Sequence, residues 1–115
     1  MSMALTTNAD SIPCVSLDGA VDVGAAFALR SSLTELPIEG NALVVDLGCV
    51  ERMDAAGVQL LLAFDAWLKR SGVSLSLVLP EGPARRALEG SGALARFTLL
   101  EGETDFNPGD AGDAR

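Results

Sequence analysis

The segment Ala42–Leu47 is an almost unbroken apolar run, and it is the feature that most constrains how this chain folds. Such a run is typical of a central strand that is covered on both faces. Gly48–Met53 follows, which we expect to form a loop, and Asp54 then precedes a long stretch with helical spacing of apolar residues. A buried strand followed directly by a helix predicts a layered α/β structure.

The flanking segments continue this alternation of strands and helices. Glycines and prolines mark the expected ends, with Asp18-Gly19 read as a turn after the first clear strand. The pattern predicts an α/β structure in which strands alternate with helices. The further expected strands are Ala4–Ala9, Cys14–Leu17 and Val73–Leu79. The expected helices are Val23–Leu36, Ala55–Ser71 and one beginning near Pro83, and Ala95–Leu100 is a short helix or an edge strand.

The length of 115 residues suits one domain, and its composition changes near residue 100. Glu101–Arg115 holds five acidic residues and almost nothing to bury. We therefore expect residues 1–100 to form the domain and residues 101–115 to form an acidic, flexible C-terminal tail.

The formal net charge of −8 limits the classes of partner. Nucleic acids and anionic membranes are bound by clustered Lys and Arg, so both are disfavoured, whereas a basic patch on a protein is compatible. The N-terminal segment lacks the features of a secretory signal, and no apolar run approaches the roughly 20 residues that span a bilayer. We expect a cytoplasmic location.

The absence of histidine and tyrosine narrows the chemistry further. Without histidine, Ser-His-Asp and Cys-His catalysis and most zinc sites are excluded. We expect no enzymatic activity, no catalytic residue, no metal and no cofactor.

The helix after Asp54 carries the candidate binding residues. Asp54 is suited to cap this helix, as Asp22 is suited to cap the preceding helix. Successive helical residues turn by about 100°, which predicts a core face and, beside it, an uncharged stripe. A partner interface explains the stripe, and cover by the first helix or by the acidic tail is the alternative. The core face is Gly57, Leu60, Leu61, Phe64 and Leu68, and the stripe is Ala55, Val58, Leu62 and Ala66.

The first turn of this helix offers a second element of recognition. Ala55, Ala56 and Gly57 leave their backbone N–H groups unobstructed. A helix start carries a partial positive charge that attracts carboxylates or phosphates. We therefore expect the first turn to contribute to partner binding together with the stripe.

Three motifs, in this order and spacing, resemble the STAS family, the domain shared by sulfate transporters and anti-sigma-factor antagonists. They are Gly19-Ala20-Val21-Asp22, Val44-Val45-Asp46-Leu47 and the segment Arg52–Leu61 (Arg-Met-Asp-Ala-Ala-Gly-Val-Gln-Leu-Leu). The resemblance covers about Cys14 to Leu100. It implies an α/β STAS-like fold, with a central mixed β-sheet of four to five strands and helices packed against it. It also implies a regulatory module that binds a protein partner.

One position departs from the family pattern. In the family, the Asp-Ser/Thr-Ser/Ala-Gly sequence carries a hydroxyl that a partner serine kinase phosphorylates, and the added charge releases the partner. The equivalent position here is Ala55, which has no oxygen to accept a phosphoryl group. The resemblance therefore implies constitutive binding or control from elsewhere, and an engineered substitution is a third explanation.

The partner stays open among several classes. The stretch Val58–Phe64 is similar to small stand-alone bacterial STAS proteins, some of which accompany chemotaxis and sensor-kinase systems. The resemblance implies a serine kinase or anti-sigma factor, a sensor kinase, or the ATPase subunit of a lipid-transport ABC complex. The apolar stripe could also serve a homodimer.

Two further functions compete with the adaptor. A phosphoacceptor receiver domain would use Asp46, but Asp18 and Asp22 are separated by the expected turn and Lys69 lies inside a helix. A small-ligand or nucleotide sensor would use the helix start near Asp54, where Arg52 is the nearby cation.

Overall fold

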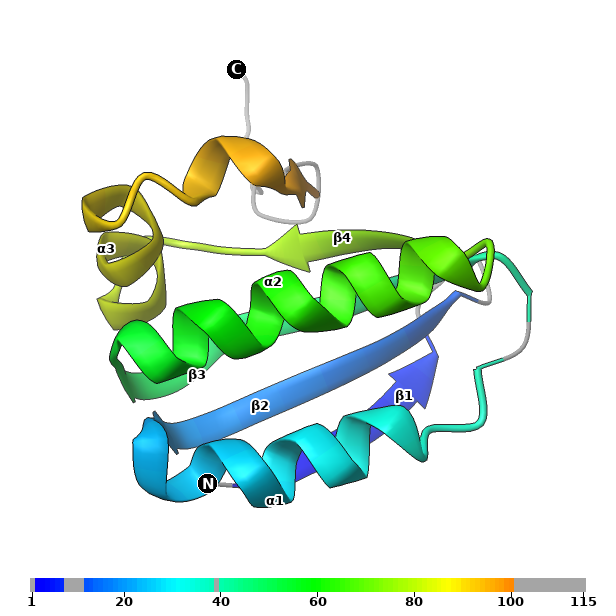
Figure 1. Cartoon of the computed structure of the whole chain (residues 1–115), viewed down its shortest axis with the longest axis horizontal. Coiled ribbons are helices and arrows are strands. Elements are labelled where there is room, and N and C mark those ends of the chain that lie inside the picture. Colours follow the sequence, from blue (N-terminus) through cyan, green and yellow to red (C-terminus); the bar gives the residue numbers. More distant parts are fainter. Residues whose placement is uncertain (1, 8–11, 39, 101–115) are drawn as a thin grey trace, which may run out of the picture.

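The computed structural model describes residues 2–7, 12–38 and 40–100, which form one sheet with helices (Figure 1). The sheet has five strands in the order β1-β2-β3-β4-β5, so neighbours in the chain are neighbours in space. β1 pairs antiparallel with β2, and every later pair is parallel. The strands are β1 (Ser2–Thr7), β2 (Pro13–Val21), β3 (Ala42–Met53), β4 (Ser74–Val78) and β5 (Thr98–Leu99). The helices are α1 (Val23–Thr34), α2 (Ala55–Arg70), α3 (Pro83–Gly90) and the 3₁₀ turn η1 (Leu94–Arg96).

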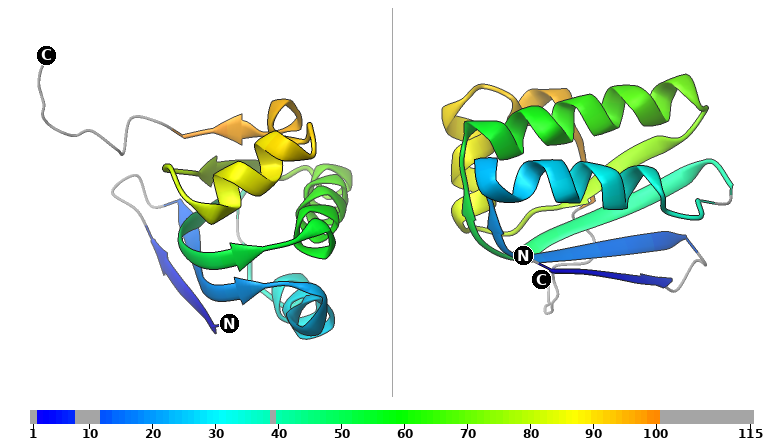
Figure 2. Two further views of the ribbon diagram at one scale, coloured as in Figure 1. Left: turned by 90° about the vertical axis from the view of Figure 1, so that its left-hand side faces the viewer. Right: turned by 60° about the horizontal axis from the view of Figure 1, so that its bottom comes forward.

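The long helices α1 and α2 lie side by side on one face of the sheet (Figure 2). Each parallel strand is added at the same edge, and crossover connections are right-handed, so successive helices arrive on the same face. α3 packs against β3 and also contacts α2. It lies near the end where α2 begins (Figure 1). The α/β fold with a mixed sheet, predicted from the sequence, is confirmed.

The core lies between the sheet and the two long helices. Leu43, Val45 and Leu47 alternate along β3 and are at most 2% exposed. From α1, Leu29 and Leu33 pack onto this layer, as the helical spacing predicts. The predicted core face of α2 is also confirmed, since all five of its members are buried: Gly57, Leu60, Leu61, Phe64 and Leu68.

Two predicted strand ends are wrong, and the two errors have one cause. Asp18-Gly19 is a bulge inside β2, where the pairing register shifts and Gly19 adopts a φ of 77°. β2 therefore continues to Val21, and the expected loop Gly48–Met53 is the second half of β3, with Val21 opposite Met53. β2 and β3 continue to pair with each other beyond the point where β4 ends. The end of the first strand was predicted from Gly19, and a glycine occurs both in turns and in β-bulges.

The remaining boundaries differ by a few residues. α1 ends at Thr34 because Leu36 precedes Pro37, and a residue before proline disfavours helical backbone. α2 ends at Arg70 and is followed by Gly72 at a φ of 79°, the C-terminal cap expected from the sequence. The predicted short helix or edge strand at 95–100 is both, η1 followed by β5. β1 includes the described part of the expected strand Ala4–Ala9. Residues 8–11 and the predicted tail, residues 101–115, lie outside the described residues.

Candidate partner-binding site

The N-terminal ends of α1 and α2 meet at one edge of the sheet, because β2 and β3 end there side by side. Asp22 caps α1, and its Oδ1 accepts a hydrogen bond from Ala25 N at 3.1 Å. Asp54 caps α2, and its Oδ1 accepts from Ala56 N at 3.0 Å and from Gly57 N at 3.2 Å. Both predicted caps are confirmed.

Each cap also bonds outside its own helix, Asp54 to the start of α1 and Asp22 to the end of β3 that leads into α2, and these bonds link the two helix starts. Asp54 Oδ2 accepts from Val23 N, the first residue of α1, at 3.2 Å. Arg52, near the end of β3 and three residues before α2, donates from Nη2 to Asp22 Oδ2 at 2.7 Å. We call these two links the helix-start brace. Sequence reasoning missed it, although Asp22 and Arg52 carry opposite charges at the ends of two strands that proved to be neighbours.

The brace predicts a pH effect. The Arg52 guanidinium, and then the Ala25 N–H, lower the pKa of the Asp22 carboxyl below its ordinary value. The contribution of Asp22 to stability is therefore fully present above its unfolded pKa of about 3.9 and is lost as the pH falls through the lower folded pKa. Arg52→Gln should raise the pKa of Asp22, measured by NMR titration of the carboxyl carbon. Arg86→Gln, which alters an exposed cation on α3, should leave this pKa unchanged.

Asp54 joins both helix starts, so its removal should affect folding. Asp54→Ala should lower the free energy of unfolding by about 2 kcal/mol, because it removes a cap and a hydrogen bond to α1. Urea denaturation measures this change. Asp54→Asn retains the Oδ1 acceptor and should cost clearly less. Equal losses for the two variants would show that the cap is not what Asp54 contributes.

Gly57 explains how closely α2 approaches β2. A Cβ at this position would meet the carbonyl oxygen of Val21 and would lie 2.9 Å from Met53 Cγ. The same Val21 oxygen accepts from Asp54 N at 3.4 Å. The glycine therefore serves packing of the helix start onto β2, in addition to leaving the first turn unobstructed as the sequence predicts.

The predicted apolar stripe is broken. Val58 is 2% exposed and belongs to the core, so its expected place on a docking surface is wrong. α3 packs beside this flank of α2, a neighbour that helical spacing in α2 alone could not reveal. Leu62 is half-buried and packs against the core, whereas Ala55 and Ala66 are exposed and Ala56 is half-buried.

Two exposed apolar residues that sequence reasoning missed lie on α1. Val23 and Phe27 are 76% and 78% exposed, and they are one helical turn apart. Val23 is tied to Asp54, so this apolar pair begins beside the start of α2. Helical spacing places both residues away from the side of α1 that carries the core residues Leu29 and Leu33, and this spacing is the signal that could have identified them as exposed. We call Val23, Phe27, Asp54 and Ala55 the helix-start surface.

The structure does not support the anion site expected at the start of α2. The carboxylate of Asp54 occupies the amides of Ala56 and Gly57, and Val58 N donates to Asp54 O. An external anion would have to displace a group of the same charge. The helix start is thus suited to protein contact more than to capture of a phosphate.

Asp46 and Lys69, the candidates for a receiver site, lie apart in unrelated surroundings. Asp46 lies in the middle of β3, not at its end, and its Oδ1 accepts from Gly48 N at 2.8 Å. Lys69 pairs with Asp65 on α2 at 3.0 Å. Within the described part of the chain, no three metal-binding side chains cluster. The receiver arrangement is therefore not formed.

In the described ranges, no helix combines the length and the apolar character needed to cross a bilayer.

Comparison with known proteins gives the family. The family model described as "Mlab, STAS domain" matches residues 5–100. No curated protein matches this chain.

Solved structures agree with this assignment. An anti-sigma factor antagonist from Mycobacterium paratuberculosis is 26% identical, with 87% of this chain and 85% of that chain covered and a TM-score of 0.68. The unphosphorylated form of the anti-sigma factor antagonist SpoIIAA is 18% identical, covers 89% and 90%, and has a TM-score of 0.65, which shows the fold. The structure titled Mglu is 27% identical with a TM-score of 0.58, but the match spans 68% of this chain and only 19% of that chain. The chain belongs to the STAS domain family, as its three sequence motifs indicated.

Proposed function

We propose that this chain is a non-enzymatic, protein-binding STAS module that docks its partner on the helix-start surface. The observation that carries the proposal is the exposure of Val23 and Phe27 directly beside Asp54 and Ala55. Large apolar side chains that remain exposed next to a braced, rigid segment are typical of interface anchors. The residues named from the sequence that keep exposed surface remain part of the proposal: Asp54, Ala55, Ala56, Leu62 and Ala66. Gly57, named with them, is buried against β2 and contributes by positioning the helix start.

The partner we propose is an anti-sigma factor of the serine-kinase class. The 26% identical protein is titled an anti-sigma factor antagonist, and its match covers most of both chains. The net charge of −8 favours a partner with a basic contact surface. A sensor kinase and the ATPase subunit of a lipid transporter are the other partner classes that the family implies.

Phosphorylation at the start of α2 would not control this binding. SpoIIAA, similar in fold, is also known in a phosphorylated form. Ala55 provides no hydroxyl at the position that the family motif assigns to the acceptor. We propose that the chain binds constitutively in the cytoplasm.

A binding series tests the proposal. The chain is titrated calorimetrically with purified serine-kinase anti-sigma factors, and separately with transporter ATPase subunits, encoded in its own genome. Phe27→Asp should weaken binding of the true partner by about tenfold or more, because a charge replaces an apolar anchor. Leu5→Asp is the matched control, since Leu5 on β1 is another large exposed apolar residue among those described.

Three results contradict the proposal. If Phe27→Asp binds as the unmodified chain does, or if Leu5→Asp weakens binding equally, the helix-start surface is not the interface. If only the ATPase subunit binds, the proposed partner class is wrong.

A further inference from the structure

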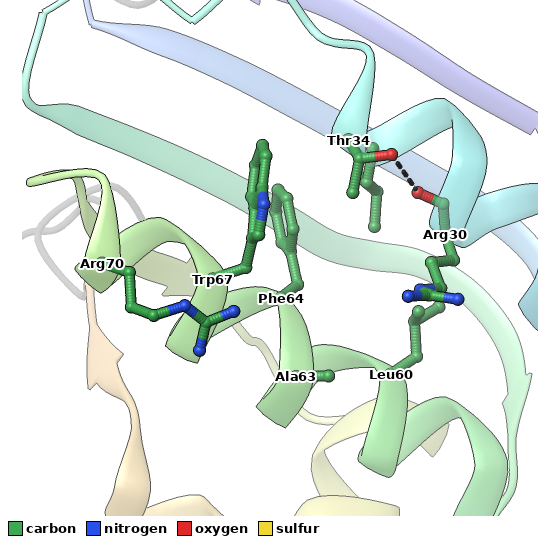
Figure 3. A pocket seen from close by; sticks show the side chains of 8 residues that line it. Arg30, Thr34, Leu60, Ala63, Phe64, Trp67 and Arg70 are labelled. Carbon is green, nitrogen blue, oxygen red and sulfur yellow. Dashed lines mark hydrogen bonds between the residues drawn. The ribbon is translucent and has the colours of Figure 1, made fainter.

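A groove lies between α1 and α2, on the flank of α2 turned towards α1 (Figure 3). Its volume is about 180 Å³. An apolar cavity of about 150 Å³ holds one benzene molecule. The groove therefore has room for one flat ring with a small substituent.

The walls of the groove are apolar and aromatic. Leu33 and Leu60 form its buried part, and Ala63 lies exposed at its edge. Phe64 and Trp67 stack with their ring centroids 5.9 Å apart and an interplanar angle of 17°. Phe64 is buried, whereas Trp67 is half-buried and still presents surface to the groove. A flat ring would extend this stack or lie against it.

Two arginines give the groove a positive charge in a strongly acidic protein. Arg30 from α1 and Arg70 from α2 flank the aromatic pair on opposite sides (Figure 3). Neither forms an ion pair with a described residue, in contrast to Arg52, Lys69 and Arg85. No acidic side chain lines the groove. The two positive charges are therefore not neutralised locally, although the chain carries a net charge of −8.

We propose that this groove binds a small aromatic carboxylate, with its ring against Trp67 and its anionic group attracted by the positive charges of Arg30 and Arg70, which flank the ring. Guanidinium groups form charge-assisted hydrogen bonds to carboxylates and also stack on flat rings. Both features of such a ligand thus have a counterpart in the groove. The site is separate from the helix-start surface, so it adds a ligand to a module otherwise proposed to bind protein.

The single tryptophan makes the test specific, because Trp67 provides the one indole N–H signal of the chain. The ¹⁵N-labelled protein is titrated with indole-3-carboxylate and, separately, with neutral indole-3-carboxamide at constant ionic strength. The carboxylate should shift the Trp67 indole signal to saturation with a Kd of about 1 mM, as expected of so small a ligand. The carboxamide should bind about fivefold more weakly, since it lacks the charge.

Variants then test the two arginines. Arg30→Gln and Arg70→Gln should each weaken carboxylate binding by about two- to threefold, which together make up the difference between the two probes, and leave carboxamide binding unchanged. Arg86→Gln, on α3 outside the groove, should change neither. Unaltered backbone signals elsewhere confirm that each variant is folded.

The proposal is overturned if the two probes bind with equal affinity, or if the Trp67 signal does not shift. It is also overturned if Arg30→Gln and Arg70→Gln bind the carboxylate as tightly as the unmodified chain does. None of these outcomes bears on the helix-start surface, whose test uses a protein partner.

Discussion

Replacing Gly57 with alanine should lower the free energy of unfolding by about 3 kcal/mol, although alanine is the better helix former. The added methyl group would meet the Val21 carbonyl oxygen and crowd Met53 Cγ, and neither neighbour is a flexible side-chain end. Relief requires α2 to move away from β2, which would also strain the hydrogen bond from Asp54 N to Val21 O. Urea denaturation of the two proteins measures the change.

Gly90→Ala is the matched control for this substitution. Gly90 ends α3, and a Cβ there meets nothing within 4 Å. This variant should be as stable as the unmodified chain or more stable by about 1 kcal/mol. If Gly57→Ala were equally stable, the close approach of α2 to β2 would not exist in solution.

Ala55→Glu should weaken partner binding by about tenfold or more while leaving the protein folded. The substitution places a negative charge where the family motif carries its phosphorylated hydroxyl. The bound partner would bury that charge beside the apolar side chains of Val23 and Phe27, and removing it from water costs free energy. Ala55 is exposed at the first position of α2, where an acidic residue favours the helix dipole. Thermal unfolding should therefore change little, which separates the effect on binding from an effect on folding.

Two control variants show whether the effect of Ala55→Glu on binding comes from the charge of the new side chain, from its size, or from its position. Ala55→Gln adds a side chain of similar size without the charge and should bind more tightly than Ala55→Glu. Ala95→Glu adds the same charge at an exposed position on η1, away from the helix-start surface, and should bind normally. Normal binding by Ala55→Glu would mean that the partner does not contact the start of α2.

Much of the fold could be predicted because local signals and tertiary packing agree. The apolar run in β3, the caps at Asp22 and Asp54, and Gly72 after α2 each act over a few residues, and the structure uses them as predicted. The extension of β2 and β3 could not be predicted in the same way. It depends on pairing between segments about 30 residues apart in the chain, and the glycine at the bulge reads locally as a turn.

The candidate site could be predicted less completely, for the same physical reason. Helical spacing in α2 showed which residues share a side, but not that α3 packs against one flank, so Val58 was assigned to the wrong surface. Phe27 could not be identified as an interface residue from the sequence, because a single apolar residue outside the predicted core face is common in proteins. The links of Arg52 to Asp22 and of Asp54 to Val23 required the knowledge that the two helix starts are adjacent.

Mapping of the interface by NMR tests the central claim most directly. The ¹⁵N-labelled chain is titrated with the anti-sigma factor proposed as its partner, and the backbone amide signals are followed. We expect the largest shifts and losses of intensity at Val23, Phe27 and Ala55. Changes confined to β1 or to η1, with these three signals unmoved, would contradict the account.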